Sequence, residues 1–237
     1  AATGALLRYM HELQPGGVPH LSRPVIERPG GTMPLDEMTR RNLELVESLR
    51  GGDTSGTLLS VMDRTLTPMG ARLLRQWILT PLTDRNAIEA RLNTVELFAD
   101  DPMGRESVRE ALDGVRDVER LASKAAAGRG TPRDLRALGD SVARLPRLHA
   151  SLEKLAVGWK GSANPLASLL KDWDACADIS ADIVATIVEN PPIAMGDEVC
   201  IREGVDADLD EWRSLRDGGK DAIARIQTEE RARTGIN

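Results

Sequence analysis

The sequence predicts a mainly α-helical protein, with a multi-helix core bundle, a small β element near the N-terminus and a long helix projecting at the C-terminus. Aromatic residues make up only 3% of the 237 residues, so a core has to be built from Leu, Ala, Val and Ile, a mixture that favours helices over sheets. Apolar residues recur at spacings of three and four, which places them on one face of a helix. Helix-start signals also recur along the chain after residue 35.

Residues 1–34 combine a short helix with a stretch rich in proline and glycine. Ala5–Leu13 is expected to be helical, and the prolines and glycines that follow it stop the helix. His20–Glu27 could form a short strand. Pro24 restricts that strand to a sheet edge, because proline lacks the N–H that a central strand donates.

Almost all of the chain after Asp36 is expected to be helical, and Asp36 itself can cap the first helix. The expected helices in the middle of the chain cover residues 36–42, 57–64, 68–79, 105–112 and 115–126. Asp84 caps another helix, whose apolar face is formed by Ile88, Leu92 and Val95 with Phe98 or Ala99.

The sequence Thr131-Pro132-Arg133-Asp134 is a strong helix start, because a capping threonine, a proline and an acid follow in the preferred order. The helix carries one apolar stripe, formed by Leu135, Leu138, Val142, Leu145, Leu152 and Leu155. Pro146 is expected to kink it. Residues 166–189 should form one or two further helices, and residues 195–202 a short strand or hairpin.

The last segment, Asp206–Thr234, is expected to form a helix that leaves the body of the protein. At about 1.5 Å per residue it would span about 44 Å. Its apolar residues form a narrow stripe that ends at Ile226. Gly218 and Gly219 lie near its middle, where each costs roughly 1 kcal/mol relative to alanine, so a bend is possible there.

Composition and charge exclude several classes of protein. The net charge is −6, so tight duplex DNA binding by this chain alone is not expected. Cys176 and Cys200 do not make a disulfide framework and indicate a reducing cytoplasm. No apolar run approaches the ~18 residues that span a bilayer. The start lacks a signal peptide, and the missing initial Met suggests a segment cut from a longer chain.

Two arrangements of residues mimic sites for anions. Gly51–Thr57 resembles the first half of a phosphate-binding loop, but the lysine after the last glycine is missing and no buried strand precedes it. An interhelical loop is the better interpretation. Arg40, Arg41, Arg72 and Arg75 could form a basic face, although solvated arginines with acidic partners are the more ordinary expectation.

No cluster meets the requirements of a metal or catalytic site. The alternating acids at 206–210 have Glu211 where a calcium loop requires glycine, and those at 172–182 have Ala177 there. Asp100-Asp101 lacks the third acid of helical prenyl-chain enzymes. The histidines at 11, 20 and 149 lack ligand spacing, and His149 is expected in the core or at its rim.

A set of short motifs between Met33 and Leu82 carries a resemblance to a known family. The residues concerned are Leu35, Asp36, Thr39, Arg40, Arg41, Asn42, Leu43, Glu44, Asp63, Arg64, Thr65, Gly70, Arg72, Leu73, Leu74, Pro81 and Leu82. Further blocks follow at 117–121, 132–135, 210–212 and 229–235. Together they resemble the core-domain signature of the MutS family of DNA mismatch-recognition proteins, and the signature residues are interpreted as structural.

The resemblance implies a division of the chain and a role. Residues 1–34 would be the end of a connector and a linker, 35–203 the helical core domain, and 204–237 a lever leading to a DNA clamp. The core and lever would link that clamp to an ATPase, in a homodimer that binds mismatched duplex DNA and a MutL-type partner in the bacterial cytoplasm, associated with the nucleoid. ATP and Mg²⁺ are implied for the full-length protein and no cofactor for this segment.

The resemblance assigns no catalytic, cofactor or metal residue to this chain. Phe98 is followed by Ala99-Asp100, which departs from the Phe-x-Glu motif of the family's mismatch reader. The chain also lacks a Walker A motif, so the segment is not expected to be an enzyme. Two alternatives remain: the core of a MutS homologue that acts in recombination, and a stand-alone helical interaction module. A helical enzyme is the third choice, which the acidic clusters argue against.

Overall fold

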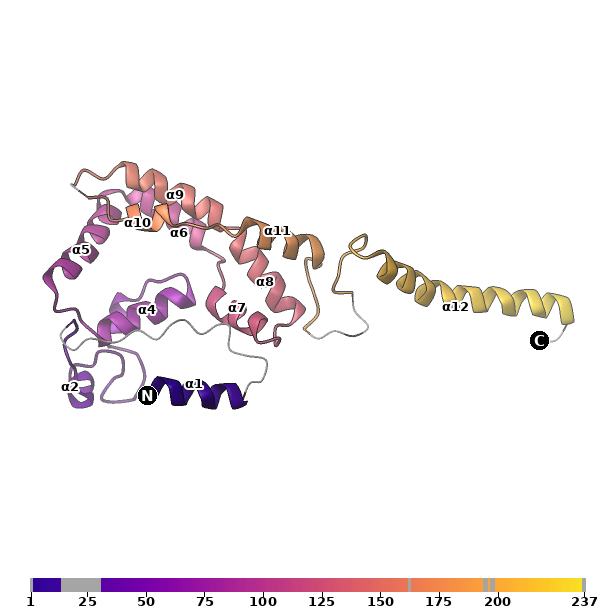
Figure 1. Cartoon of the computed structure of the whole chain (residues 1–237), viewed down its shortest axis with the longest axis horizontal. Helices are drawn as coiled ribbons and strands as arrows, with labels where there is room; N and C mark the ends of the chain where they lie inside the picture. The colour runs from indigo at the N-terminus through magenta and orange to yellow at the C-terminus, as the bar shows by residue number, and fades with distance from the viewer. Residues whose placement is uncertain (1, 14–30, 162, 194–195, 197–198, 236–237) are drawn as a thin grey trace.

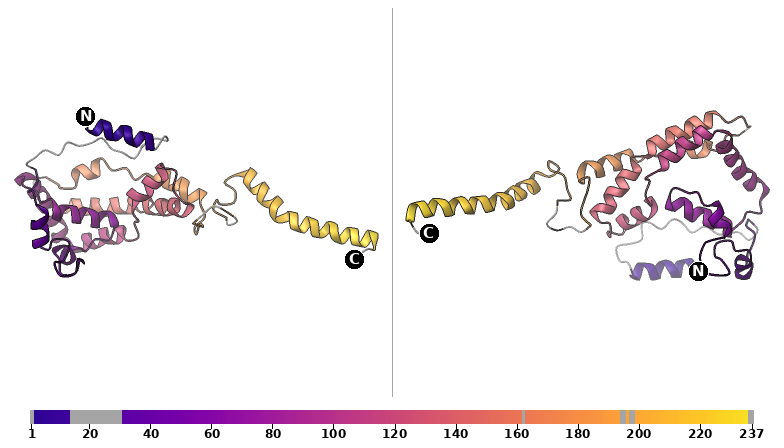
Figure 2. Two further views of the ribbon diagram at one scale, coloured as in Figure 1. Left: turned by 90° about the horizontal axis from the view of Figure 1, so that it is seen from below. Right: turned by 180° about the vertical axis from the view of Figure 1, so that it is seen from behind.

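The structure is a computed structural model that describes residues 2–13, 31–161, 163–193, 196 and 199–235. These residues are mainly helical, which confirms the predicted fold class. Their helices are α1 (Ala2–Leu13), α2 (Glu37–Asn42), α3 (Leu58–Met62), α4 (Pro68–Leu79), α5 (Arg85–Asp100), α6 (Pro102–Leu112), α7 (Val118–Ala126), α8 (Pro132–Val142), α9 (Leu145–Val157), α10 (Ala167–Lys171), α11 (Ala177–Thr186) and α12 (Ala207–Thr234). Figure 1 shows α12 as an arm that projects from a body formed by the other helices, and both views in Figure 2 show the same separation.

Most of these helices begin where local signals predict, because a side chain accepts a hydrogen bond from a free N–H of the first turn. Asp36, Asp84 and Asp206 accept such bonds at 2.7, 2.8 and 2.9 Å. Thr131 and Asp134 bond each other reciprocally and form a capping box at the start of α8. These interactions span three residues, so the sequence alone can specify them.

The described residues of the body bury two apolar clusters. The larger cluster joins α5, α6 and α9 to the start of α10, and its buried members are Leu97, Val108, Ala111, Leu148, Leu152, Leu155, Ala156 and Leu166. The smaller cluster joins the α2–α3 region to α4 and is centred on Leu45, Val46 and Leu59. At the end of the body nearest α12, α8 packs against both α7 and α11 (Figure 1). The body is therefore a multi-helix bundle, as predicted, whose buried core is divided between two apolar clusters.

The helix predicted to run from residue 131 to 155 with a kink is divided into two helices. α8 ends at Val142 and α9 begins at Leu145, with Pro146 in the first turn of α9. Proline has no N–H to donate, and its ring clashes with the preceding turn, so it is tolerated at a helix start and disfavoured in a helix interior. The expectation of one kinked helix was wrong for this reason.

The apolar face predicted for α5 is largely exposed. The exposed fractions of Ile88, Leu92 and Val95 are 36%, 58% and 62%, whereas Leu97 is buried at 4%. Only the end of α5 reaches the larger cluster, and its earlier turns connect that cluster to the smaller one (Figure 1). The spacing identifies an apolar stripe, but nothing in the described residues covers its first three members.

The β structure of the described residues is limited to single bridges. Thr32 pairs antiparallel with Leu82, and the N–H of Met33 donates to the carbonyl of Pro81 at 2.7 Å. Ile187 pairs antiparallel with Ile201, which lies within the strand or hairpin predicted for 195–202. The strand predicted for His20–Glu27 lies outside the described residues.

Candidate functional site

We define residues 35–82 as the signature segment. Within it, Glu44 stabilises the loop between α2 and α3. Glu44 has a φ of 45°, in the left-handed region that residues other than glycine rarely adopt. Its carboxylate accepts a hydrogen bond from the N–H of Leu49 at 2.8 Å, and its carbonyl accepts one from Leu58 at 3.1 Å. Gly51–Thr57 lie in this loop, as predicted for an interhelical connection.

Other signature residues make local turns and contacts between segments. The hydroxyl and N–H of Thr65 both donate to Asp63, and these bonds hold the pKa of that carboxyl below its ordinary value. Thr67 caps α4, because its hydroxyl oxygen accepts a hydrogen bond from the N–H of Gly70 at 3.2 Å. The carbonyl of Arg64 accepts a bond from the Arg109 guanidinium at 3.0 Å, which ties this turn to α6.

Arg72 joins the signature segment to α7. Its guanidinium donates to both carboxylate oxygens of Asp117, one of them at 3.0 Å, and also donates to Glu119. Bidentate pairing of this kind fixes geometry as well as charge. It is also the largest cause that holds the pKa of Asp117 below its ordinary value. The sequence interpretation noted Asp117 and Glu119 as part of a motif but did not pair them with Arg72.

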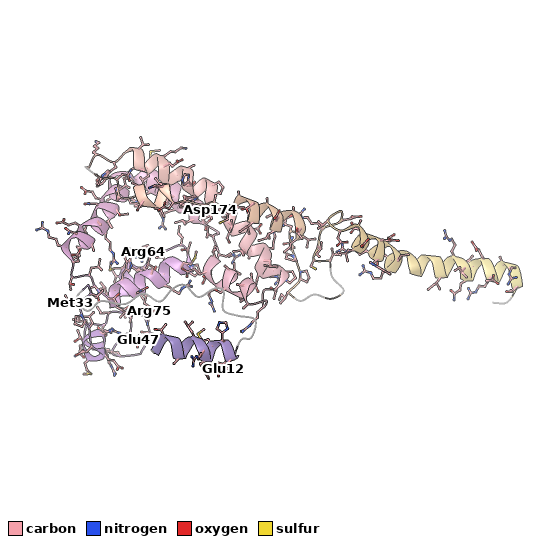
Figure 3. The ribbon with its side chains drawn as sticks, in the orientation of Figure 1. Glu12, Met33, Glu47, Arg64, Arg75 and Asp174 are labelled. Atoms are coloured by element: carbon pink, nitrogen blue, oxygen red, sulfur yellow. The ribbon has the colours of Figure 1, made fainter. Side chains whose placement is uncertain are left out.

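The remaining arginines of the predicted basic face surround a small cavity. Arg40, Arg41 and Arg75 line a space of about 370 Å³ together with Glu37 and Glu47. Arg75 pairs with Glu47 across it at 3.6 Å, and Figure 3 labels both side chains beside α4. Arg72 and Arg75 therefore have acidic partners, as the sequence analysis expected for solvated arginines. Arg40 and Arg41 are exposed at the edge of the cavity.

Some of the signature residues are directed into the body, and others lie at the surface. Those directed into the body are Leu35 and Leu74, which pack against the smaller apolar cluster. Those at the surface are Arg40, Arg41, Asn42, Leu43 and Leu73. Close to Leu73, the guanidinium of Arg91 lies 3.8 Å from the centre of the Trp77 ring, a cation–π contact that joins α4 to α5. Thr39 is half-buried, and its N–H donates to the Asp36 side chain that caps α2.

The base of α12 is anchored to the segment that directly precedes it by side chains of its own first two turns. Arg213 donates to the carbonyl of Ile201 at 3.0 Å and pairs with Asp210 at 3.1 Å. Asp210 also accepts a bond from the N–H of Gly204 at 2.6 Å. The helix then continues to Gly235, whose φ of 67° ends it.

A sequence of polar contacts leads from this anchor to the signature segment. Ile201 pairs with Ile187, whose carbonyl accepts bonds from Arg136 of α8 at 3.1 Å and from Arg202 at 3.1 Å. α8 is tied to α7 by the pair Lys124–Asp134 at 3.1 Å. α7 is in turn tied to α4 through Arg72. The base of the arm is therefore connected to α4 through α8 and α7.

The described residues offer no group of three His, Cys, Asp or Glu side chains that could hold a metal ion. His149 lies at the core rim as predicted, with its ring centre 5.2 Å from that of Trp173. Its Nδ1 is 3.5 Å from Glu153. Among the described helices, none combines the length and hydrophobicity that crossing a bilayer requires.

The apolar stripe of α12 is uncovered, and we expect it to drive self-association of this chain. Trp212 is 70% exposed and Ile223 is 63% exposed. Exposed apolar patches tend to find partners, so sedimentation velocity should show concentration-dependent oligomers as the chain approaches ~1 mM. Replacing Trp212 and Ile223 by Gln should abolish them, whereas Val157→Gln, at an even more exposed site on α9, should not. A strictly monomeric chain at that concentration would contradict this expectation.

Comparison with known proteins gives a consistent result. The family described as MutS domain III matches residues 38–233. The chain is 38% identical over 235 residues to the DNA mismatch repair protein MutS of Salinibacter ruber, covering 99% of this chain and 25% of that protein. It is 40% identical over 236 residues to the protein of the same name from Symbiobacterium thermophilum, covering 100% of this chain and 26% of that protein. The chain spans about a quarter of the length of these curated relatives.

Proposed function

The chain belongs to the MutS family, and on that premise we propose that it is the core and first lever of a longer mismatch-repair protein, where it links a DNA clamp to an ATPase. The observation that carries this proposal is α12, a continuous helix of 28 residues with caps at both ends. It is anchored at its base and extends away from the body (Figure 2). A rod of this kind can carry a displacement at its tip to its base, because its hydrogen-bond ladder is unbroken.

The contacts beyond the base support a transmitting role. Coupling between distant sites is carried by packed side chains and polar networks, and a claim of coupling needs direct measurement. Here, the network runs from Arg213 through Ile201 and Arg136 to α7, and from there through Arg72 to α4. The exposed signature residues beside α4, including Arg40 and Arg41, are candidates for contacts with the rest of the longer protein.

The division of the chain follows from the same proposal. Residues 1–34 would be the end of a connector and a linker, 35–203 the core domain, and 204–237 the lever. The ATP and Mg²⁺ that the ATPase uses would bind elsewhere in the longer protein. That protein would act in the bacterial cytoplasm, at the nucleoid, as a homodimer with mismatched duplex DNA and a MutL-type protein as its partners.

This chain alone is expected neither to hydrolyse ATP nor to bind duplex DNA tightly. The loop at 51–57 lacks the lysine of a phosphate-binding loop, and the net charge of −6 opposes binding to a polyanion. Phosphate release and fluorescence anisotropy with a labelled mismatched duplex would measure both properties. ATP turnover above background, or submicromolar duplex binding at physiological salt, would overturn the structural and transmitting role in favour of an enzyme or a stand-alone binding module.

A further inference from the structure

Two cavities adjoin each other along one face of α8. The larger, of about 740 Å³, lies between α7, α8 and the start of α4, and the smaller, of about 410 Å³, lies between α8 and residues 189–191. Gly114, Arg116, Arg133 and Ala137 line both of them. We call the larger cavity, together with these four shared residues, the α8 groove. It lies away from the cavity at Arg40 and Arg41. The ion pairs of the proposed lever pathway, Arg72–Asp117 and Lys124–Asp134, border it, but its three other arginines have no part in that pathway.

The two carboxylates that line the α8 groove are paired with cationic side chains. Asp117 is held by Arg72, and Asp134 is held by Lys124 and by the capping threonine of α8. Backbone and side-chain donors keep the pKa of Asp134 below its ordinary value, so it stays ionised within these pairs. Both acids that line the larger cavity are therefore occupied by partners.

Three arginines of the groove form no close ion pair among the described residues, although the charge of Arg120 is one of the causes that keep the pKa of Asp117 low. Arg116 and Arg120 are exposed and engage no acceptor through their guanidinium groups. Arg133 makes one long bond, at 3.4 Å, to the carbonyl of Pro191. Guanidinium groups match phosphate oxygens in geometry and are less strongly hydrated than ammonium groups. The lining of the larger cavity holds the cations Arg116, Arg120, Lys124 and Arg133 against the acids Asp117 and Asp134, an excess of two positive charges in a chain of net charge −6. This local excess favours the binding of a compact anion.

The lining between these arginines is apolar. Leu66, Pro68, Val115, Leu121 and Ala137 form it, and Val115 is buried. A cavity of several hundred Å³ with an apolar floor and a few polar groups suits a small molecule. An extended nucleic-acid backbone fits less well, because it would reach beyond a cavity of about 740 Å³.

We propose that the α8 groove binds a nucleoside polyphosphate, with its phosphates on Arg116, Arg120 and Arg133 and its base over the apolar floor. The proposal goes beyond the lever function and concerns binding without hydrolysis. Free polyphosphate shares the recognised chemistry but lacks a group for the floor. Comparing the two ligands therefore separates the contribution of the floor from that of the arginines.

The test is a titration of this chain at low salt with ATP, tripolyphosphate and adenosine, followed by isothermal calorimetry and by amide chemical shifts. ATP should bind saturably with a dissociation constant below about 1 mM, tripolyphosphate several-fold more weakly, and adenosine not measurably. Shift changes should centre on residues 114–137. Replacing both Arg116 and Arg120 by Gln should weaken ATP binding at least tenfold. The matched control, Arg225→Gln with Arg231→Gln on α12, makes the same change in charge and should alter it less than twofold.

Several results would overturn the proposal. Absence of saturable ATP binding would contradict it. If the control pair at Arg225 and Arg231 weakens ATP binding as much as the pair at Arg116 and Arg120, the bound phosphate is an adventitious ion only. Equal affinity for ATP and tripolyphosphate would mean that the nucleoside contributes nothing to binding, and the proposed ligand would be wrong. Duplex DNA that binds more tightly than ATP through the same arginines would make the groove a nucleic-acid surface. Thermal melts check that the variants fold, and Ala137→Glu, which adds a carboxylate to the floor, provides an independent variant that should also abolish binding.

Discussion

Leu155→Ala is expected to lower the free energy of unfolding of this chain by about 2–5 kcal/mol. Leu155 is 1% exposed in α9, within the cluster that joins α5, α6 and α10. A Cβ added to Gly104 of α6 would lie only 2.7 Å from the Cδ1 methyl group of Leu155. The two helices α6 and α9 therefore approach closely at this point. Truncation removes buried methyl groups and leaves a cavity that these helices cannot easily close. Such a loss is a large fraction of the total stability of a domain.

Urea denaturation followed by circular dichroism would measure this effect, with the slope of the transition checked for constancy. Val157→Ala is the matched control, because Val157 lies in the same helix and is 87% exposed. It should change the free energy of unfolding by less than about 0.5 kcal/mol. Equal effects at the two positions would mean that α9 is not packed on α6 in the way described.

Ile223→Pro in the longer protein is expected to weaken the effect of DNA on ATP turnover and to leave nucleotide binding near normal. Proline removes one bond of the helical ladder and clashes with the preceding turn, at a cost of ~3 kcal/mol or more. Coupling free energies are typically ~1–3 kcal/mol, so a break of this size is sufficient to uncouple the two sites. Ile223 is exposed and lies beyond the anchor formed by Arg213 and Asp210, so the body should still fold.

The measurement compares ATPase rates with and without mismatched duplex. Ile223→Ala removes the same apolar side chain but keeps the ladder, and Gln227→Ala tests a nearby polar position. Both controls should respond to DNA like the unmodified protein. If the proline variant responds as fully as they do, α12 does not act as a mechanical lever.

Much of the helical organisation could be predicted because it depends on neighbours three or four residues apart. The N-cap residues Asp36, Thr131 and Asp206 act on their own first turns, and the start of α8 needs only Thr131 to Asp134. The polar tip and the capping Gly235 of α12 are likewise local properties. For the same reason, the motif residues could be recognised as a set without knowledge of their contacts.

The candidate site was less predictable, because its interactions join distant parts of the chain. Arg72 could be suspected of having an acidic partner, but Asp117 and Glu119 follow 45 and 47 positions later. Arg136 reaches the carbonyl of Ile187, 51 positions away, and no local pattern marks that contact. The left-handed conformation of Glu44 also had no signal, since glutamate does not favour it.

The sequence by itself therefore determined that the chain is helical, where most helices begin, that a long arm ends it, and to which family it belongs. Only the tertiary structure decided which apolar faces are buried, as the exposed Leu92 and buried Leu97 of α5 illustrate. It also decided that residues 131–155 form two helices and that Arg72 joins α4 to α7. The physical reason is that capping and propensity are short-range interactions, whereas burial and ion pairing depend on which distant segments the fold brings into contact.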